Sequence, residues 1–271
     1  MLPTCLPWYV ERGDGPLVAT AIHDGQGVQP NMLKVMALTR AERLHEEDPF
    51  TGTWTTVAPT RLIGLRSRFE VDLNRPRDKA VYLTPDDAWR LQVWKEAPST
   101  ECVERSLAIH DAFHDEVRAL LQRMVHRYQR VVVLDLHTYN HRREGPNNSA
   151  ADPIENPEVN IGTGTMDRRR WAPIVDRFIV DLRNFDFLGR RLDVRENVKF
   201  RGGYFPTWIH EQFPESVCVL SIEFKKFFMD EWTGDADQVQ LSAIERALKS
   251  TVWGLHEELV RIGLSQREVP A

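Results

Sequence analysis

The chain has 271 residues and a formal net charge of −5, and hydrophobic and charged residues make up 42% and 28% of it. This composition is typical of a soluble globular protein with a full core, and the negative charge argues against a general binder of nucleic acid or lipid surfaces. The length allows one large α/β domain or two small ones. Because no linker-like segment divides the sequence, we expect one domain over residues 1–271.

No run of residues approaches the roughly 18 apolar residues of a membrane span, and residues 1–7 lack the basic and apolar regions of a secretion signal. We therefore expect a cytoplasmic protein, a monomer or small homo-oligomer, without nucleic-acid or membrane partners. The three cysteines, Cys5, Cys102 and Cys218, form no CxxC pair. The sequence thus predicts neither a disulfide framework nor a thiolate zinc site.

The first predicted strand, residues 17–22, is short and apolar and leads directly to His23 in a glycine-containing turn. Residues 37–48 then indicate a helix or turn that Pro49 halts. Its acidic end contains Glu47 and Asp48. Such clusters usually face solvent, and the alternative is that one of these carboxylates turns inward.

Residues 67–73 alternate polar and apolar side chains, which predicts a strand ending at Asn74 and Arg75. A long amphipathic helix should follow over residues 101–130. Residues 131–136 then form an apolar, β-branched run that predicts a strand buried on both faces and ending at His137. The remaining predicted elements are a polar loop at 141–148, strand 159–163, helix 172–184, a loop with two glycines at 201–210, strand 216–222 and helix 236–262.

Strands that alternate with helices predict an α/β sandwich with a central sheet. Sheets of this kind place their chemistry at the carboxyl ends of the strands. Several polar residues of the chain are predicted at or just beyond such ends: His23, Asn74, Arg75, His137 and Glu223.

Two histidines and one carboxylate, with a position left for water, are the ligand set of a catalytic zinc site. His23 and His137 supply the nitrogens for one zinc ion, and we favour Asp48 as the carboxylate, with Glu47 second and Asp24 third. Zinc lowers the pKa of a bound water to about 7, so an amide could be attacked at neutral pH. Glu223 is the best candidate for the general base that accepts the proton of this water.

Arginine holds a carboxylate through two parallel hydrogen bonds and carries a permanent charge, which points to a small anionic substrate. We expect Arg68 to be catalytic and a further set to bind the substrate: Asn74, Arg75, Tyr204 and His210. One of the arginines, or Tyr204 or His210, could instead face the oxyanion that forms on the attacked carbonyl.

At these residues the sequence resembles the N-formylglutamate amidohydrolases, a family similar to the zinc carboxypeptidases and aspartoacylase. The resemblance rests on residues 67–75 (Ser-Arg-Phe-Glu-Val-Asp-Leu-Asn-Arg), 135–140 (Asp-Leu-His-Thr-Tyr-Asn), 201–204 (Arg-Gly-Gly-Tyr) and 221–231 (Ser-Ile-Glu-Phe-Lys-Lys-Phe-Phe-Met-Asp-Glu). It implies a three-layer α/β sandwich with a mixed central sheet, of the zinc-carboxypeptidase-like (phosphorylase/hydrolase-like) class. The implied activity is hydrolysis of N-formyl-L-glutamate to formate and L-glutamate, a late step of histidine degradation.

By this resemblance His23, Asp48 and His137 match the metal positions and Glu223 matches the general base. Arg68, Asn74 and Arg75 match residues that hold the substrate carboxylate in the carboxypeptidases. The chain departs from the family pattern around His23, where we expect a Pro-His-Ser-Gly type of turn. It has Gln26 where the carboxypeptidases carry a ligand glutamate, which is why we assign the carboxylate ligand to Asp48.

Two other functions remain open. The same metal site could serve a carboxypeptidase or peptide amidase, which would need an open cleft. The segments 83–101 and 141–157 instead favour a site closed over a small substrate. Alternatively, the protein could be a metal-free binding or scaffold protein in which these polar residues only stabilise strand ends.

Overall fold

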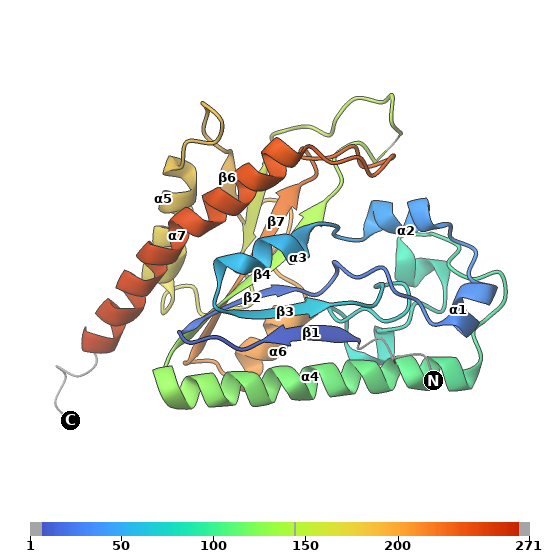
Figure 1. The fold of residues 1–271 in the computed structure, drawn as a ribbon, viewed down its shortest axis with the longest axis horizontal. Helices are drawn as coiled ribbons and strands as arrows, with labels where there is room; N and C mark the ends of the chain where they lie inside the picture. Colours follow the sequence, from blue (N-terminus) through green and yellow to red (C-terminus); the bar gives the residue numbers. More distant parts are fainter. Residues whose placement is uncertain (1–6, 144, 266–271) are drawn as a thin grey trace.

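The computed structural model describes residues 7–143 and 145–265, so the predictions for residues 1–6, Cys5 and Glu144 lie outside the described residues. In the described part, the strands are β1 (Trp8–Glu11), β2 (Leu17–Ala21), β3 (Thr60–Gly64), β4 (Val131–Tyr139), β5 (Val159–Gly162), β6 (Val194–Glu196) and β7 (Val217–Lys225). They form one mixed sheet in the order β1-β3-β2-β4-β7-β5-β6 (Figure 1). The four central strands β3, β2, β4 and β7 run parallel, whereas β1 and β5 are antiparallel to their neighbours β3 and β7.

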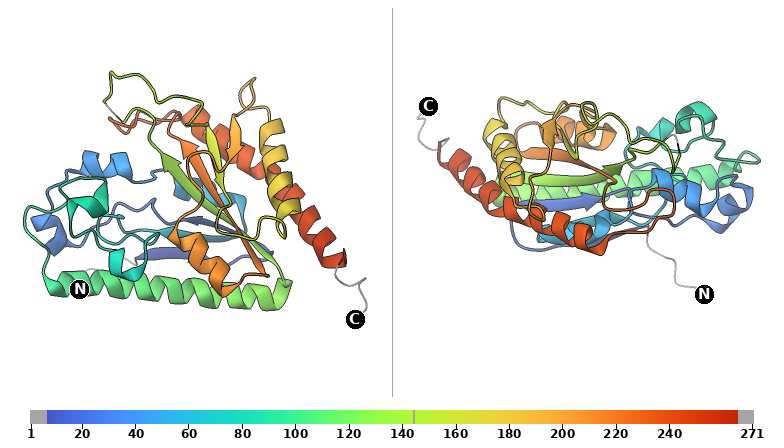
Figure 2. Two further views of the ribbon diagram at one scale, coloured as in Figure 1. Left: turned by 180° about the vertical axis from the view of Figure 1, so that it is seen from behind. Right: turned by 90° about the horizontal axis from the view of Figure 1, so that it is seen from above.

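Helices cover both faces of this sheet. The α-helices are α1 (Pro30–Val35), α2 (Arg40–Glu46), α3 (Thr51–Trp54), α4 (Thr100–Tyr128), α5 (Ala172–Asn184), α6 (Tyr204–Gln212) and α7 (Gln238–Ser265). Short 3-10 helices lie at η1 (Thr55–Val57), η2 (Arg77–Lys79) and η3 (Pro85–Ala88). Helices α5 and α7 lie side by side (Figure 2).

The two-residue period of β4 directs its side chains into two core clusters, one on each face of the sheet. Val131 and Val133 pack into the cluster that contains residues of α4 and α6. Val132 and Leu134 pack on the other face, with α3, α5 and α7. Every residue of β4 is buried, as its apolar first half predicted.

Most of the predicted elements are confirmed with small shifts in their ends, and two predictions are wrong. Residues 67–73 form turns instead of a strand, because the backbone N–H groups of Glu70 and Val71 bond back to the carbonyl of Ser67. The predicted loop at 201–210 contains α6, so His210 is helical. Strands β4 and β7 also extend past their predicted ends, which places His137 and Glu223 within the strands.

Cys102 and Cys218 are buried free thiols. None of the described helices is both long and apolar enough to cross a membrane.

Leu134→Ala tests the central position of β4. Leu134 is 0% exposed, and truncation of a buried leucine costs about 2–5 kcal/mol of unfolding free energy through lost burial and a residual cavity. Leu83→Ala is the matched control, since Leu83 is 55% exposed and should change stability by less than about 0.5 kcal/mol. Chemical denaturation measures both. Equal losses in the two variants would contradict the placement of β4 in the core.

Candidate functional site

Strand geometry places three acidic or imidazole side chains together at the carboxyl ends of the central strands. Asp135 and His137 are two residues apart on β4 and therefore share a face, the one covered by α4 and α6. The register between β4 and β7 pairs His137 with Glu223, which sits on the same face of β7. The predicted proximity of His137 and Glu223 follows directly from this register.

Asp48 is held beside His23 by the main chain. Its backbone N–H donates to the carbonyl of His23 over 3.0 Å, and its own carbonyl accepts from the Thr51 hydroxyl over 2.7 Å. The Thr138 hydroxyl donates to Asp48 Oδ1 over 3.0 Å. These contacts tie the turn before α3 to the ends of β2 and β4 and fix the direction of the Asp48 carboxylate.

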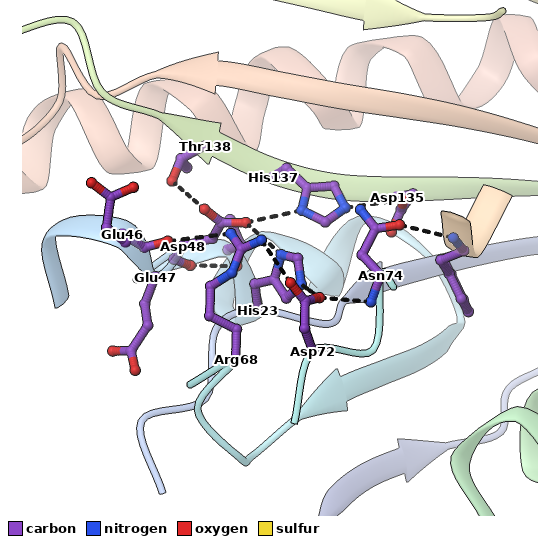
Figure 3. Close-up of polar contacts among 12 residues, drawn as sticks. His23, Glu46, Glu47, Asp48, Arg68, Asp72, Asn74, Asp135, His137 and Thr138 are labelled. Carbon is purple, nitrogen blue, oxygen red and sulfur yellow. Dashed lines mark hydrogen bonds and ion pairs between the residues drawn. The ribbon is translucent and has the colours of Figure 1, made fainter. Parts of the chain in front are cut away.

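His23 and His137 converge on this carboxylate (Figure 3). Asp48 Oδ2 lies 2.9 Å from Nδ1 of His137 and 3.4 Å from Nδ1 of His23. One donor atom from each of the three residues lies within 4.8 Å of the other two, and all three side chains are buried. The other two carboxylates are used elsewhere: Glu47 accepts from the Ser67 hydroxyl, and Asp24 accepts from backbone groups of Phe50 and Gly52.

A buried carboxylate backs each imidazole on its far side. Nε2 of His23 lies 2.7 Å from Asp72 Oδ1, and Nε2 of His137 lies 3.0 Å from Asp135 Oδ2. Both aspartates are 0% exposed. Histidines that bind metals commonly use their second nitrogen in this way, which fixes the ring and its tautomer. The Nδ1 atoms are thereby directed at Asp48.

The geometry and charge of this cluster fit a divalent cation. The buried Nδ1 of His23 has no hydrogen-bond partner among the described residues. Burial alone would raise the pKa of Asp48, but its hydrogen bond to His137 and the proximity of His23 hold that pKa well below its usual range. Burial alone would likewise lower the pKa of His137, but the Asp135 charge and hydrogen bonds raise it, so the cluster favours positive charge at this point. Two imidazole nitrogens and a carboxylate are also a known set for Zn²⁺.

Glu223 and Lys226 line the same cavity as His23, Asp48 and His137. Burial raises the pKa of Glu223 to about 8 and lowers that of Lys226 to about 8. The Lys226 ammonium donates to the carbonyls of His45 and Glu47, over 2.6 and 2.9 Å. Lys226 therefore fixes the chain immediately before Asp48.

Arg68 is held rigidly at the cavity wall. Its guanidinium donates to Asp72 Oδ2 over 2.9 Å, to the Tyr82 hydroxyl over 3.3 Å and to the carbonyl of Glu46 over 3.3 Å. It also lies 4.7 Å from the ring centroid of Trp89. Arg68 thus contacts both Asp72, which bonds to His23, and Trp89 in the cavity wall.

The other predicted substrate residues, except His210, line the same cavity of about 460 Å³ as the histidines. The Arg75 side chain is 41% exposed and lies 3.9 Å from Asp72. Asn74 Oδ1 accepts from the backbone N–H of Phe205 over 2.8 Å, and a Cβ at position 203 would lie 2.4 Å from this oxygen. Gly203 therefore allows Asn74 to approach the first turn of α6, next to Tyr204.

His210 lies away from this cavity. Its Nε2 accepts from the backbone N–H of Val219 over 3.1 Å, and its Nδ1 lies 3.0 Å from the Thr165 hydroxyl. The side chain lines a second cavity of about 420 Å³. His210 therefore joins α6 to β7, and the structure does not bring it to the predicted substrate residues.

Sequence reasoning missed several residues of this site: Glu46, Asp72, Trp89, Asp135, Thr138, Arg143 and Lys226. Asp135 could have been found, because it stands two residues before His137 in a predicted strand. No sequence pattern pointed to Trp89 or Arg143, which come from the segments 83–101 and 141–157. Both segments contribute to the cavity wall, as expected of segments that close a site.

A model of the N-formylglutamate amidohydrolase family matches residues 15–229, which is more than half of the chain and includes every residue of the cluster. The chain belongs to the N-formylglutamate amidohydrolase family. The resemblance seen in the sequence motifs is thereby confirmed.

Solved structures share the fold of this family member. The N-formylglutamate amidohydrolase of Ralstonia eutropha JMP134 is 17% identical with a TM-score of 0.71, and the match covers 98% of this chain and 100% of that one. A gene product of Agrobacterium tumefaciens is 15% identical with a TM-score of 0.62 and 96% coverage of both chains. A search of curated proteins found no significant match. The α/β fold with a mixed sheet is confirmed, and the zinc-carboxypeptidase-like class stays a prediction.

Asp135→Asn tests the carboxylate behind His137. The amide keeps the shape but loses the charge, so we expect the affinity for Zn²⁺ to fall by about 10- to 100-fold. Competition with a chromophoric chelator measures this affinity. Asp115→Asn is the control, because Asp115 is an exposed residue of α4. Unchanged affinity in Asp135→Asn would show that this carboxylate does not support a metal ligand.

Proposed function

We propose that the protein hydrolyses the formyl amide bond of N-formyl-L-glutamate, giving formate and L-glutamate. The observation that carries this proposal is the convergence of His23, Asp48 and His137 in the cavity that also contains Glu223 and Arg75. Membership of the amidohydrolase family supports the reaction type.

In this proposal His23, Asp48 and His137 would hold a single zinc ion. When bound, zinc supplies Lewis acidity and lowers the pKa of a water to about 7. Asp72 and Asp135 keep the two imidazoles oriented, and the Thr138 hydroxyl keeps the Asp48 carboxylate in place. These contacts hold the three side chains in the orientation that a shared metal ion would require.

Glu223 acts as the general base and then as the general acid. Its carboxylate accepts a proton from the attacking water, and the new C–O bond makes the formyl carbon tetrahedral. The same carboxyl group then delivers this proton to the glutamate nitrogen as the C–N bond breaks. Burial raises the pKa of Glu223 to about 8 in the metal-free cavity. A cation held by the neighbouring His137 and Asp48 would lower this pKa, so that the carboxylate form needed for the first step is available near neutral pH.

The two arginines have different proposed roles. Arg75 is half-exposed in the cavity and is the group we assign to the α-carboxylate of the substrate. Arg68 is fixed by Asp72 and Tyr82, so its charge is preorganised to stabilise the oxyanion on the formyl carbon.

The size of the cavity favours a small substrate over a peptide. Its volume of about 460 Å³ lies in the range of small-molecule sites, and Trp89 and Arg143 from two surface segments form part of its wall. A carboxypeptidase or peptide amidase would require a cleft that accepts a longer chain.

Formate release from N-formyl-L-glutamate, measured with purified protein and zinc, tests the proposed reaction. We expect turnover by the wild type and a loss of about 10²- to 10⁴-fold in kcat in Glu223→Gln, because the amide cannot accept the proton. The variant should retain zinc, since Glu223 is outside the ligand set.

Glu215→Gln is the matched control, because the Glu215 side chain is 72% exposed and does not line the cavity. Near-normal turnover in Glu223→Gln would refute the assignment of the base. A wild-type enzyme that contains zinc but releases no formate would refute the proposed substrate.

A further inference from the structure

Arg143 lies at the cavity on the segment 141–157, which the sequence predicted to close the site without assigning a role to this arginine. The loop follows β4, and the Arg143 guanidinium forms an ion pair with the Glu46 carboxylate at the end of α2. It also lies 5.9 Å from the ring centroid of Trp89. Glu46, Trp89 and Arg143 all line the cavity that contains the histidines.

The base of this loop is anchored. The buried Glu231 carboxylate accepts from the backbone N–H groups of His141 and Arg142, over 3.0 and 2.7 Å. The Trp232 indole donates to the carbonyl of Arg142 over 3.0 Å. The residue immediately before Arg143 is therefore fixed on both its N–H and its carbonyl, which holds Arg143 at the cavity.

Three arginines follow one another along the cavity wall. Arg75 and Arg68 both form ion pairs with the Asp72 carboxylate. Arg68 and Arg143 both lie over the Trp89 ring. Arg68 also donates to the Glu46 carbonyl, and Arg143 pairs with the Glu46 carboxylate. Arg68 thus lies between the other two. Its charge is already matched by a buried carboxylate, whereas Arg75 and Arg143 have side chains that are 41% and 50% exposed.

Two accessible guanidinium groups on either side of a fixed one suit a ligand with two carboxylates. We infer that Arg143 is the specificity-determining residue for an acidic N-acyl amino acid and that it binds the side-chain carboxylate of this substrate. In the complex, the substrate carboxylate replaces the Glu46 carboxylate as the ion-pair partner of Arg143. Arg75 binds the α-carboxylate at the other end of the row. This inference rests on the proposed function and assigns recognition of the substrate side chain to Arg143.

Comparison of N-formyl-L-glutamate with its near-isosteric amide, N-formyl-L-glutamine, tests the inference. The wild type should prefer the glutamate substrate in kcat/KM. Arg143→Ala should lower kcat/KM for N-formylglutamate by about 10- to 100-fold and leave that for N-formylglutamine nearly unchanged, because only the first substrate has a side-chain charge. Arg75→Ala should lower both values together, since both substrates have the α-carboxylate.

Two more variants sharpen the test. Glu46→Gln should lower KM for N-formylglutamate, because the competing carboxylate is gone while the shape is kept. Arg142→Ala is the matched control, since its side chain is exposed and absent from the cavity lining. Thermal unfolding checks that every variant is folded, and Arg143→Gln replaces Arg143→Ala if the latter is not.

The outcomes separate the two proposals. If the wild type hydrolyses neither compound, the proposed function and this inference both fail. If it hydrolyses N-formylglutamate but Arg143→Ala lowers both substrates equally or neither, the inference is overturned and the proposed function stands. A raised KM for N-formylglutamate in Glu46→Gln would also contradict the exchange of Glu46 for the substrate.

Discussion

The site depends on the placement of two imidazoles between buried carboxylates. Asp48 lies between the Nδ1 atoms of His23 and His137, and Asp72 and Asp135 occupy their Nε2 atoms. Burial of so many acidic groups is costly unless each has a partner, so the cluster constrains every element that contributes to it. The same arrangement brings two imidazole nitrogens and a carboxylate oxygen to one point, on which the proposed chemistry rests.

The fold builds this cluster from parts that are far apart in the sequence. Strand period and register bring Asp135, His137 and Glu223 to one face of the sheet. Asp48 comes from a turn whose position is set by main-chain contacts to His23 and by the Lys226 ammonium. The arginines come from loops outside the sheet, so the substrate contacts can vary while the cluster is kept.

The sequence predicted the parts that local pattern controls. The buried run of β4 and the amphipathic helices α4, α5 and α7 follow from periodicity. The strand-end pattern and the family resemblance predicted that His23, Asp48 and His137 share one site, and the structure brings these three residues together. Residues 67–73 resemble a strand in sequence because Phe69, Val71 and Leu73 alternate with polar residues, yet they lie in turns and Glu70 and Asp72 are buried as well. His210 was misplaced because a histidine after a glycine pair gives no sign of the face on which its helix will pack. Arg143 was missed because its position depends on tertiary contacts to Glu231 and Trp232.

Measurement of zinc in the purified protein tests the central claim most directly. The account predicts near-stoichiometric zinc in the wild type and its loss in a His23→Ala, His137→Ala double variant that keeps its secondary structure by circular dichroism. Zinc content that is equal in both proteins, or no zinc binding by the wild type after addition of the metal to the apo form, would contradict the proposal that these two imidazoles share one ion.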